Sequence, residues 1–167
     1  MTMTSTQEWL DCFNKLQELS DKLGVGDPFN YNRGREIHTA LTLGLQISDT
    51  LSGADAYKNG EPVELKSTIG SLKATYNGVS VQPSWEEQER YLVEDKLGKY
   101  KQHYICRYEG SNLAECYVLS SDDVLAILLP KFKKQYHSKR NAKDPRLGQQ
   151  INAKEIKQFG FRVVLDR

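Results

Sequence analysis

Apolar residues recur at helical spacing near the start of the chain. Between Thr6 and Leu23 they occupy the positions Trp9, Leu10, Phe13, Leu16, Leu19 and Leu23. This spacing predicts an amphipathic helix that Thr6 caps and Gly24 ends, with its apolar stripe facing the core. A second helix is expected over residues 34–45, with inward-facing positions Ile37, Leu41 and Leu45.

Residues 63–69 alternate instead with the two-residue period of a β-strand. In such a strand Glu64 and Lys66 project from one face, and the apolar neighbours project from the other. The Asn59-Gly60 pair just upstream is a strong turn signal, so the chain near Asp55 folds back beside this strand as a hairpin. Asp55 is therefore expected next to Glu64.

The remaining pattern predicts further strands and helices. We expect a second hairpin over residues 70–82 with a turn at Asn77-Gly78, and a helix over 84–97 capped by Ser84. Strands are expected over 101–108 and 112–119, and they complete a mixed sheet. The last predicted elements are a helix over 122–136, a short helix in which Ile156 and Phe159 pack inward, and a strand over 161–165.

Size and charge limit the possible functions. A chain of 167 residues without internal repeats is expected to form one domain, residues 1–167. A net charge of only +1 argues against a protein that coats polyanions in general. Residues 131–157, however, contain 9 Lys and Arg against 2 acidic residues. That local field attracts a phosphate backbone, although a solvated basic surface has the same composition.

Cysteine use and hydropathy indicate a cytoplasmic protein. The three cysteines, Cys12, Cys106 and Cys116, have no CxxC spacing. They fit buried thiols in a reducing compartment better than a disulfide framework or a zinc site. We find no signal peptide, and no apolar run approaches the roughly 18–20 residues of a membrane span, so no membrane contact is expected.

The first predicted hairpin contains the candidate catalytic residues. Two carboxylates held together, here Asp55 and Glu64, repel each other unless a cation lies between them. Mg²⁺ suits such a pair, because it takes one or two carboxylates together with water and phosphate oxygens. The ammonium of Lys66 can orient an attacking water and offset charge on a phosphate. The pattern thus suits phosphodiester hydrolysis, but an ordinary solvated hairpin often has the same residues.

The sequence of this stretch resembles a nuclease motif. Gly53-Ala54-Asp55-Ala56 is followed by Glu64-Leu65-Lys66-Ser67. This arrangement is similar to the PD-(D/E)xK motif, and in detail to the PvuII-like branch of type II restriction endonucleases. Asp27–Gly34, Tyr104–Gly110 and the region from Lys143 to Gly160 also match that branch in order and spacing, more loosely.

The resemblance implies both fold and activity. The implied fold class is α+β, an α/β/α arrangement in which helices flank a central mixed β-sheet with an added DNA-reading hairpin. The implied activity is Mg²⁺-dependent, sequence-specific cleavage of double-stranded DNA by a homodimer on a palindromic site. Mn²⁺ is expected to replace Mg²⁺, and no nucleotide cofactor is expected. In this family the N-terminal region supplies dimer contacts, so part of the first helix would be intersubunit.

Specific residues inherit roles from the resemblance. Asp55 and Glu64 would bind the metal together with the carbonyl of Leu65, and Lys66 would position the nucleophilic water. Glu36 is either an auxiliary acid that faces the metal or a surface residue paired with Arg33 or Arg35. Tyr100 corresponds to an aromatic residue that approaches the scissile phosphate.

DNA contacts are expected from three polar segments: the loop before the second helix, the second hairpin and the basic C-terminal region. Their amides, hydroxyls and cations suit base edges or phosphates. The expected contact residues are Asn30, Asn32, Thr75, Asn77, Ser80, Gln82, Lys139, Arg140, Lys143, Arg146, Gln149, Gln150 and Asn152.

Two other functions remain open on the sequence. One is a structure-specific or repair nuclease of the same fold, since a polar hairpin can read shape as well as bases. The other is a DNA-binding module without catalysis, which the presence of Asp55, Glu64 and Lys66 opposes.

Overall fold

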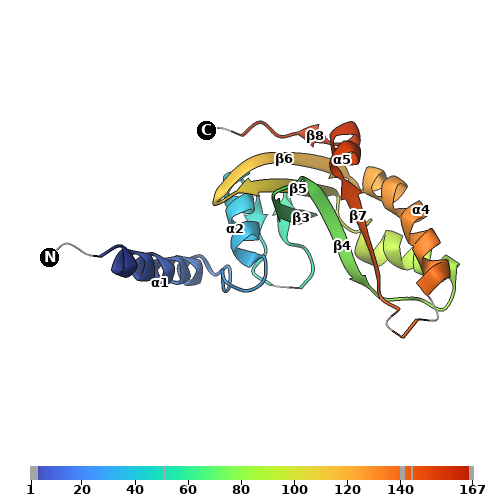
Figure 1. Cartoon of the computed structure of the whole chain (residues 1–167), viewed down its shortest axis with the longest axis horizontal. Helices are drawn as coiled ribbons and strands as arrows, with labels where there is room; N and C mark the ends of the chain where they lie inside the picture. Colours follow the sequence, from blue (N-terminus) through green and yellow to red (C-terminus); the bar gives the residue numbers. More distant parts are fainter. Residues whose placement is uncertain (1–3, 51, 140–141, 144, 166–167) are drawn as a thin grey trace.

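The computed structural model describes residues 4–50, 52–139, 142–143 and 145–165 of the chain (Figure 1). Five α-helices, one π-helix and eight strands occur in this described part. In chain order they are α1 (Ser5–Leu23), α2 (Arg33–Thr42), β1 (Gln46–Ile47), β2 (Ala56–Lys58), β3 (Glu61–Ile69), β4 (Lys73–Val79), α3 (Trp85–Arg90), the π-helix η1 (Tyr91–Lys96), β5 (Gln102–Glu109), β6 (Asn112–Ser120), α4 (Ser121–Lys139), β7 (Leu147–Asn152), α5 (Ala153–Phe159) and β8 (Phe161–Arg162).

The main sheet has six strands in the order β1-β2-β3-β5-β6-β8. β3 and β5 are parallel, and the other neighbours are antiparallel. Alternation along the strands separates two apolar clusters: Val63 and Leu65 of β3 pack with Ala40 of α2, whereas Ile105 of β5 packs with α4 residues such as Leu128. The fold is therefore the predicted α+β arrangement, a mixed sheet with helices on both faces.

The predicted hairpin at Asn59-Gly60 is confirmed. β2 and β3 pair antiparallel through Lys58↔Glu61 and Ala56↔Val63. Asn59 has a φ of 52° and Gly60 one of 82°, both in the left-handed region that a tight two-residue turn of this kind requires. The turn thus sets the register that brings the segment before β2 alongside the middle of β3.

The predicted turn at Asn77-Gly78 is wrong. Both residues lie inside β4, which pairs antiparallel with β7, more than 60 residues later in the chain, as a separate two-stranded sheet. Between Tyr76 and Val79 the register shifts, and Gly78, with a φ of 71°, accommodates this irregularity. Part of the basic C-terminal region that is expected to contact DNA accordingly forms strand β7, Leu147–Asn152. Figure 1 shows the two strands side by side next to α4.

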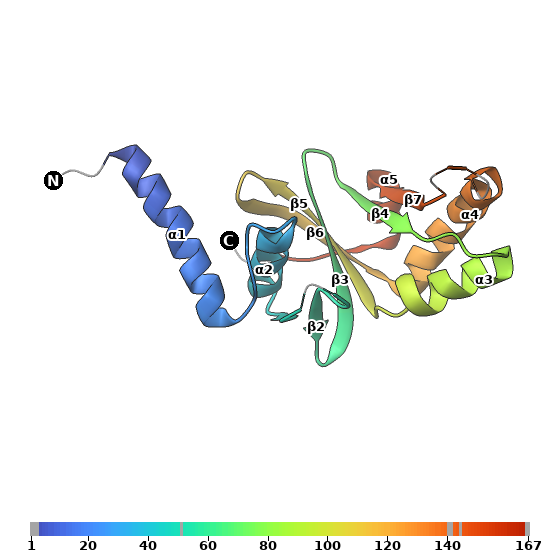
Figure 2. The ribbon, with the colours of Figure 1, turned by 90° about the horizontal axis from the view of Figure 1, so that it is seen from below.

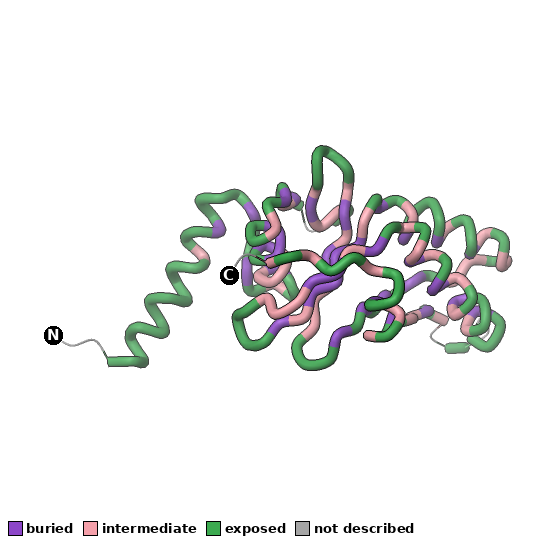
Figure 3. Tube along the Cα trace, turned by 90° about the horizontal axis from the view of Figure 1, so that it is seen from above, coloured by how far each residue is buried: buried purple, intermediate pink, exposed green. Residues whose placement is uncertain are grey.

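The helix α1 does not pack into a core, contrary to the prediction. It extends away from the sheet (Figure 2), and nearly all of its residues are exposed (Figure 3). The apolar stripe is 42–63% exposed at every position, namely Trp9, Leu10, Phe13, Leu16, Leu19 and Leu23. Thr4 rather than Thr6 caps the helix, because its side chain accepts the amide of Gln7. Gly24 ends the helix as predicted.

A few smaller predictions also need correction. Leu41 is exposed on α2, since only one side of this short helix faces the sheet, and Phe159 is exposed at the end of α5. Of the three free cysteines, Cys106 and Cys116 are buried but Cys12 is exposed on α1. No helix in the described part of the chain is long and apolar enough to cross a membrane.

Candidate active site

Asp55 lies where the β2–β3 ladder stops. The last paired residues are Ala56 and Val63, so the amide of Leu65 has no partner on β2. The carboxylate of Asp55 accepts this N–H instead, at 2.8 Å from Leu65 N to Asp55 Oδ2. A strand residue directs its N–H and C=O toward the same neighbour. The carbonyl of Leu65 therefore also points to the edge of β3 where Asp55 lies.

Glu64 and Lys66 project from one face of β3, and Val63 and Leu65 project from the opposite face, as the alternation predicted. Their side chains form an ion pair that is only partly accessible to water. Burial alone would lower the pKa of Lys66, but the charge of Glu64 and its hydrogen bond outweigh burial and raise that pKa. Lys66 is therefore a cation held at the carboxylate.

The two carboxylates interact electrostatically, which the proposed hairpin geometry requires. Burial and the nearby charge of Glu64 raise the pKa of Asp55 from 3.8 to about 7. The Leu65 amide and Lys66 oppose this shift, and Glu36 adds to it. A pKa this high means that the surroundings of the Asp55 carboxylate supply too little positive charge to stabilise its ionised form.

A polar cleft of about 270 Å³ opens beside these groups. Asp55, Leu65 and Lys66 line it, together with Glu36 from α2 and Asn32 from the loop before that helix. The remaining lining residues are Ser67, Thr68, Lys73, Thr75 and Asn77. The cleft thus connects the hairpin with the outer face of β4.

Glu36 lies between the cleft and Arg33. It lines the cleft and its charge reaches Asp55, and it also lies 3.5 Å from the guanidinium of Arg33. Arg33 is 2% exposed and donates hydrogen bonds to the carbonyl oxygens of Val25 and Ser48. A buried arginine with these contacts fixes the start of α2 and thereby the position of Glu36.

Tyr100 lies beneath the same carboxylates. Its hydroxyl donates to the carbonyl oxygen of Gly53 at 3.0 Å, two residues before Asp55. Burial, together with the charge of Glu64, raises the pKa of Tyr100. The hydroxyl is therefore a protonated donor that holds the chain leading into Asp55.

The donor set fits a hard divalent cation. Among the described residues no group of three or more His, Cys, Asp and Glu side chains could hold a metal. Asp55 and Glu64 would supply two carboxylates, and the Leu65 carbonyl would supply a third oxygen. Such a sparse all-oxygen set suits Mg²⁺, which keeps several waters, and does not suit zinc.

The predicted DNA-contacting residues fall into three groups. Asn32, Thr75 and Asn77 line the cleft. Thr75 also lies opposite Gln150 in the β4–β7 register, and Asn152 lies opposite Lys73, with all four exposed on one face.

A second group borders another shallow pocket. Lys139 and Arg146 line it with Asn77 and Gln135, and the side-chain amide of Gln149 donates to Gln135 at 3.1 Å.

The last group lies outside both pockets: Asn30, Ser80, Gln82 and Lys143, of which Ser80 and Lys143 are exposed. Arg140 lies outside the described residues. Lys131, part of the basic segment, is ion-paired with Glu155 at 2.7 Å and so is already neutralised.

Three residues of this region were not predicted from the sequence. Lys73 belongs to the cleft, but its position on an exposed strand gave no local signal. Tyr76 lies under Lys66, whose Nζ is 5.4 Å from the centroid of the tyrosine ring. His103 hydrogen-bonds to Tyr76 and appears in sequence only as an isolated histidine. It lies opposite Glu64 in the parallel β3–β5 register, which local patterns do not reveal.

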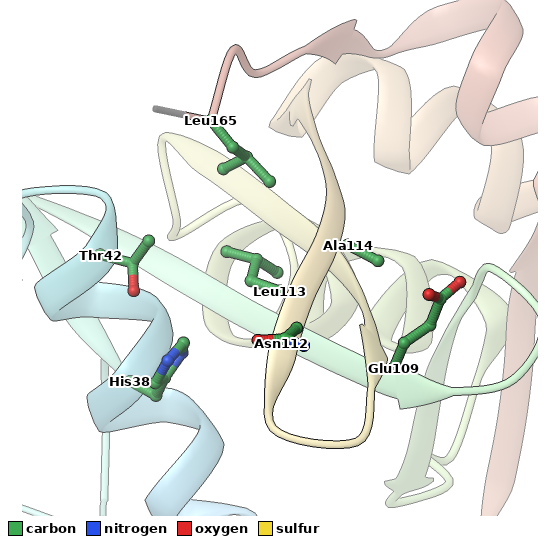
Figure 4. A pocket seen from close by; sticks show the side chains of 7 residues that line it. All are labelled: His38, Thr42, Glu109, Asn112, Leu113, Ala114 and Leu165. Carbon is green, nitrogen blue, oxygen red and sulfur yellow. The ribbon is translucent and has the colours of Figure 1, made fainter. Parts of the chain in front are cut away.

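A larger cavity, of about 550 Å³, lies elsewhere (Figure 4). It is between α2, the β5–β6 turn and the C-terminal segment, where His38, Glu109 and Leu165 contribute to its lining. Glu109 is already paired with Arg107. Its lining has a single carboxylate and no lysine, so this cavity does not offer the chemistry of the polar cleft.

Comparison with known proteins identifies one family. The family model described as Restriction endonuclease PvuII matches residues 2–160, nearly the whole chain. A comparison with curated proteins found no match.

Proposed function

Given that the chain belongs to the Restriction endonuclease PvuII family and is therefore a type II site-specific deoxyribonuclease, we propose that it cleaves both strands of a palindromic DNA site as a Mg²⁺-dependent homodimer. The observation that carries this proposal is geometric: beside an open polar cleft, Asp55 is hydrogen-bonded to the Leu65 amide and Lys66 is ion-paired with Glu64.

Asp55 and Glu64, with the carbonyl of Leu65, would hold the metal. When bound, Mg²⁺ offsets the charge on the phosphate and makes water a better nucleophile. A cation held by these carboxylates would also offset the repulsion by Glu64 that, after burial, raises the pKa of Asp55.

Lys66 is the group proposed to act on the water and the phosphate. Its ammonium is ion-paired with Glu64, and a cation held by Glu64 would compete for that carboxylate. Lys66 can then donate to the attacking water or to a phosphate oxygen. Glu36, across the cleft, can orient the same water as an acceptor.

The β4–β7 sheet is proposed to read the DNA. A two-stranded ribbon fits the major groove, and its exposed cross-strand pairs are Lys73 with Asn152 and Thr75 with Gln150. Gln and Asn suit adenine, and Lys suits guanine. Because Lys73 and Thr75 also line the cleft, bases bound on the ribbon would lie close to the phosphate being cut.

Helix α1 is proposed as the main part of the dimer interface. Its exposed stripe is a row of large apolar side chains, and Phe13 stacks on Phe29 with ring centroids 3.9 Å apart. Monomeric proteins rarely leave such a continuous apolar face in water. A two-fold partner covering it would bring two clefts to one duplex, which symmetric double-strand cleavage requires. The cytoplasm, where foreign DNA is met, is the proposed location.

Digestion of phage-sized DNA tests the proposal. With Mg²⁺ or Mn²⁺ the protein should yield discrete bands, and EDTA should leave the DNA intact. A smear would indicate a nuclease without sequence specificity, such as a structure-specific or repair enzyme. DNA that stays intact with either metal, but is bound, would contradict the enzyme and favour a binding module.

A further inference from the structure

A buried pair of side chains lies directly beneath the candidate lysine. Tyr76 of β4 is 6% exposed and His103 of β5 is fully buried, and neither has a role in the reaction described above. The tyrosine hydroxyl lies 3.1 Å from His103 Nδ1. His103 Nε2 lies 3.1 Å from the carbonyl oxygen of Leu97.

These contacts fix the hydrogen positions. A carbonyl oxygen only accepts, so His103 Nε2 carries a proton and donates it to Leu97. Burial lowers the pKa of His103 to about 4, so the ring is neutral at working pH and its Nδ1 is an acceptor. The hydroxyl of Tyr76 therefore donates to Nδ1. A chain of two hydrogen bonds ties the tyrosine ring to the backbone that follows η1.

The face of that ring is available to Lys66. Its ammonium lies 5.4 Å from the ring centroid, within the range of a cation–π contact. The ammonium is also ion-paired with the carboxylate of Glu64. If Glu64 binds a metal, as proposed above, that ion pair weakens and the aromatic ring remains. A ring holds a cation without taking its proton, so the amine stays free to donate.

We infer that Tyr76 is a positioning residue for Lys66, and that His103 acts through Tyr76 by fixing the orientation of its ring. This inference rests on the proposed function, because it assigns the pair a task only during DNA cleavage. It predicts that losing the Tyr76 ring lowers the cleavage rate more than losing the Tyr76 hydroxyl does. It also predicts that the hydroxyl affects this rate only through its hydrogen bond to His103.

Single-turnover cleavage at saturating DNA gives the first test. Tyr76→Leu should lower the rate constant about tenfold or more, and Tyr76→Phe, which keeps the ring, should lose only about two- to threefold, on the scale of a desolvated cation–π contact. DNA affinity measured in EDTA should be unchanged in both. Tyr117→Leu serves as a matched control, because Tyr117 is buried in the same apolar cluster as Tyr76 and its partners in the sheet are Ile105 and Arg162. Its rate should stay near that of the parent.

A double-mutant cycle separates positioning from mere packing. His103→Phe alone should match Tyr76→Phe in rate, and combining both should add nothing further, because either change removes the same hydrogen bond. Additive losses would contradict the idea that His103 acts through Tyr76.

Proton NMR gives a readout that does not depend on activity. The ring current of Tyr76 should shift the ε protons of Lys66 upfield, a shift that Tyr76→Phe keeps and Tyr76→Leu loses. An unshifted Lys66 signal, or a Tyr76→Leu variant that cuts as fast as the parent, overturns this inference alone. A parent protein that leaves DNA intact overturns the proposed function and the inference with it.

Discussion

Replacing Asp55 with asparagine should stabilise the metal-free protein while abolishing cleavage. In the folded chain the pKa of this carboxyl rises from 3.8 to about 7, because burial and Glu64 both disfavour its charge. A group whose pKa is raised by folding makes the folded state less stable once it must ionise. Asparagine keeps an oxygen that can accept the Leu65 amide but carries no charge.

The size of the effect follows from that shift. At 1.36 kcal/mol per pH unit, a rise of this size amounts to about 4 kcal/mol. Asp55 is only half-buried, so solvent screening reduces the expected gain at pH 8 to roughly 2–4 kcal/mol. The size of the gain depends on pH: well below pH 4 the carboxyl is protonated in both the folded and the unfolded state, and the gain vanishes. It grows as pH rises from about 4 to 7 and is then constant.

Urea unfolding in EDTA at pH 4 and pH 8 measures this gain. Asp49→Asn is the matched control, since it removes the same charge from an exposed position and should change stability by less than about 0.5 kcal/mol. Adding Mg²⁺ at pH 8 should stabilise the parent but not Asp55→Asn. The reasoning is refuted if Asp55→Asn is no more stable than the parent at pH 8, or if its gain is the same at both pH values.

Four further predictions concern catalysis, DNA affinity, assembly and specificity. Lys66→Ala should retain DNA binding and lose several orders of magnitude in cleavage rate; near-parental cutting would reject the assigned role of this lysine. Lys139→Ala should weaken binding to all sequences and lower the slope of log affinity against log salt by about one, measured by fluorescence anisotropy; an unchanged slope would mean no phosphate contact. Phe13→Glu should convert a dimer into a monomer in sedimentation experiments, whereas a parent that is already monomeric would contradict the role of α1. Gln150→Ala should cost about 1–3 kcal/mol at one base position in a library selection, and uniform losses at all positions would count against base reading.

Local signals were sufficient to predict the hairpin on which the candidate site lies. The turn at Asn59-Gly60 and the alternation through Glu64 and Lys66 are short-range features, and both lie within one hairpin of the structure. Asp55 joins them through its carboxylate, which accepts a hydrogen bond from the Leu65 amide at the end of that hairpin. The structure around the candidate site therefore follows from turn and strand patterns within about a dozen residues.

Long-range pairing explains what the sequence did not reveal. Asn77-Gly78 is a strong local turn signal, yet β4 continues through it because β7 supplies a partner from a distant segment. The stripe on α1 has the period of a core helix, and periodicity alone does not distinguish a core from a surface between two chains. His103 lies opposite Glu64 only through the parallel register of β3 and β5.

The central claim is that Asp55, Glu64 and the carbonyl of Leu65 hold one hard cation at the scissile phosphate. Anomalous diffraction from crystals of the protein with DNA and Mn²⁺, grown with Lys66→Ala to prevent cutting, tests it most directly. The account predicts an anomalous peak within coordination distance of all three groups and of a phosphate oxygen. A peak elsewhere, or none in this cleft while DNA is bound, would contradict it.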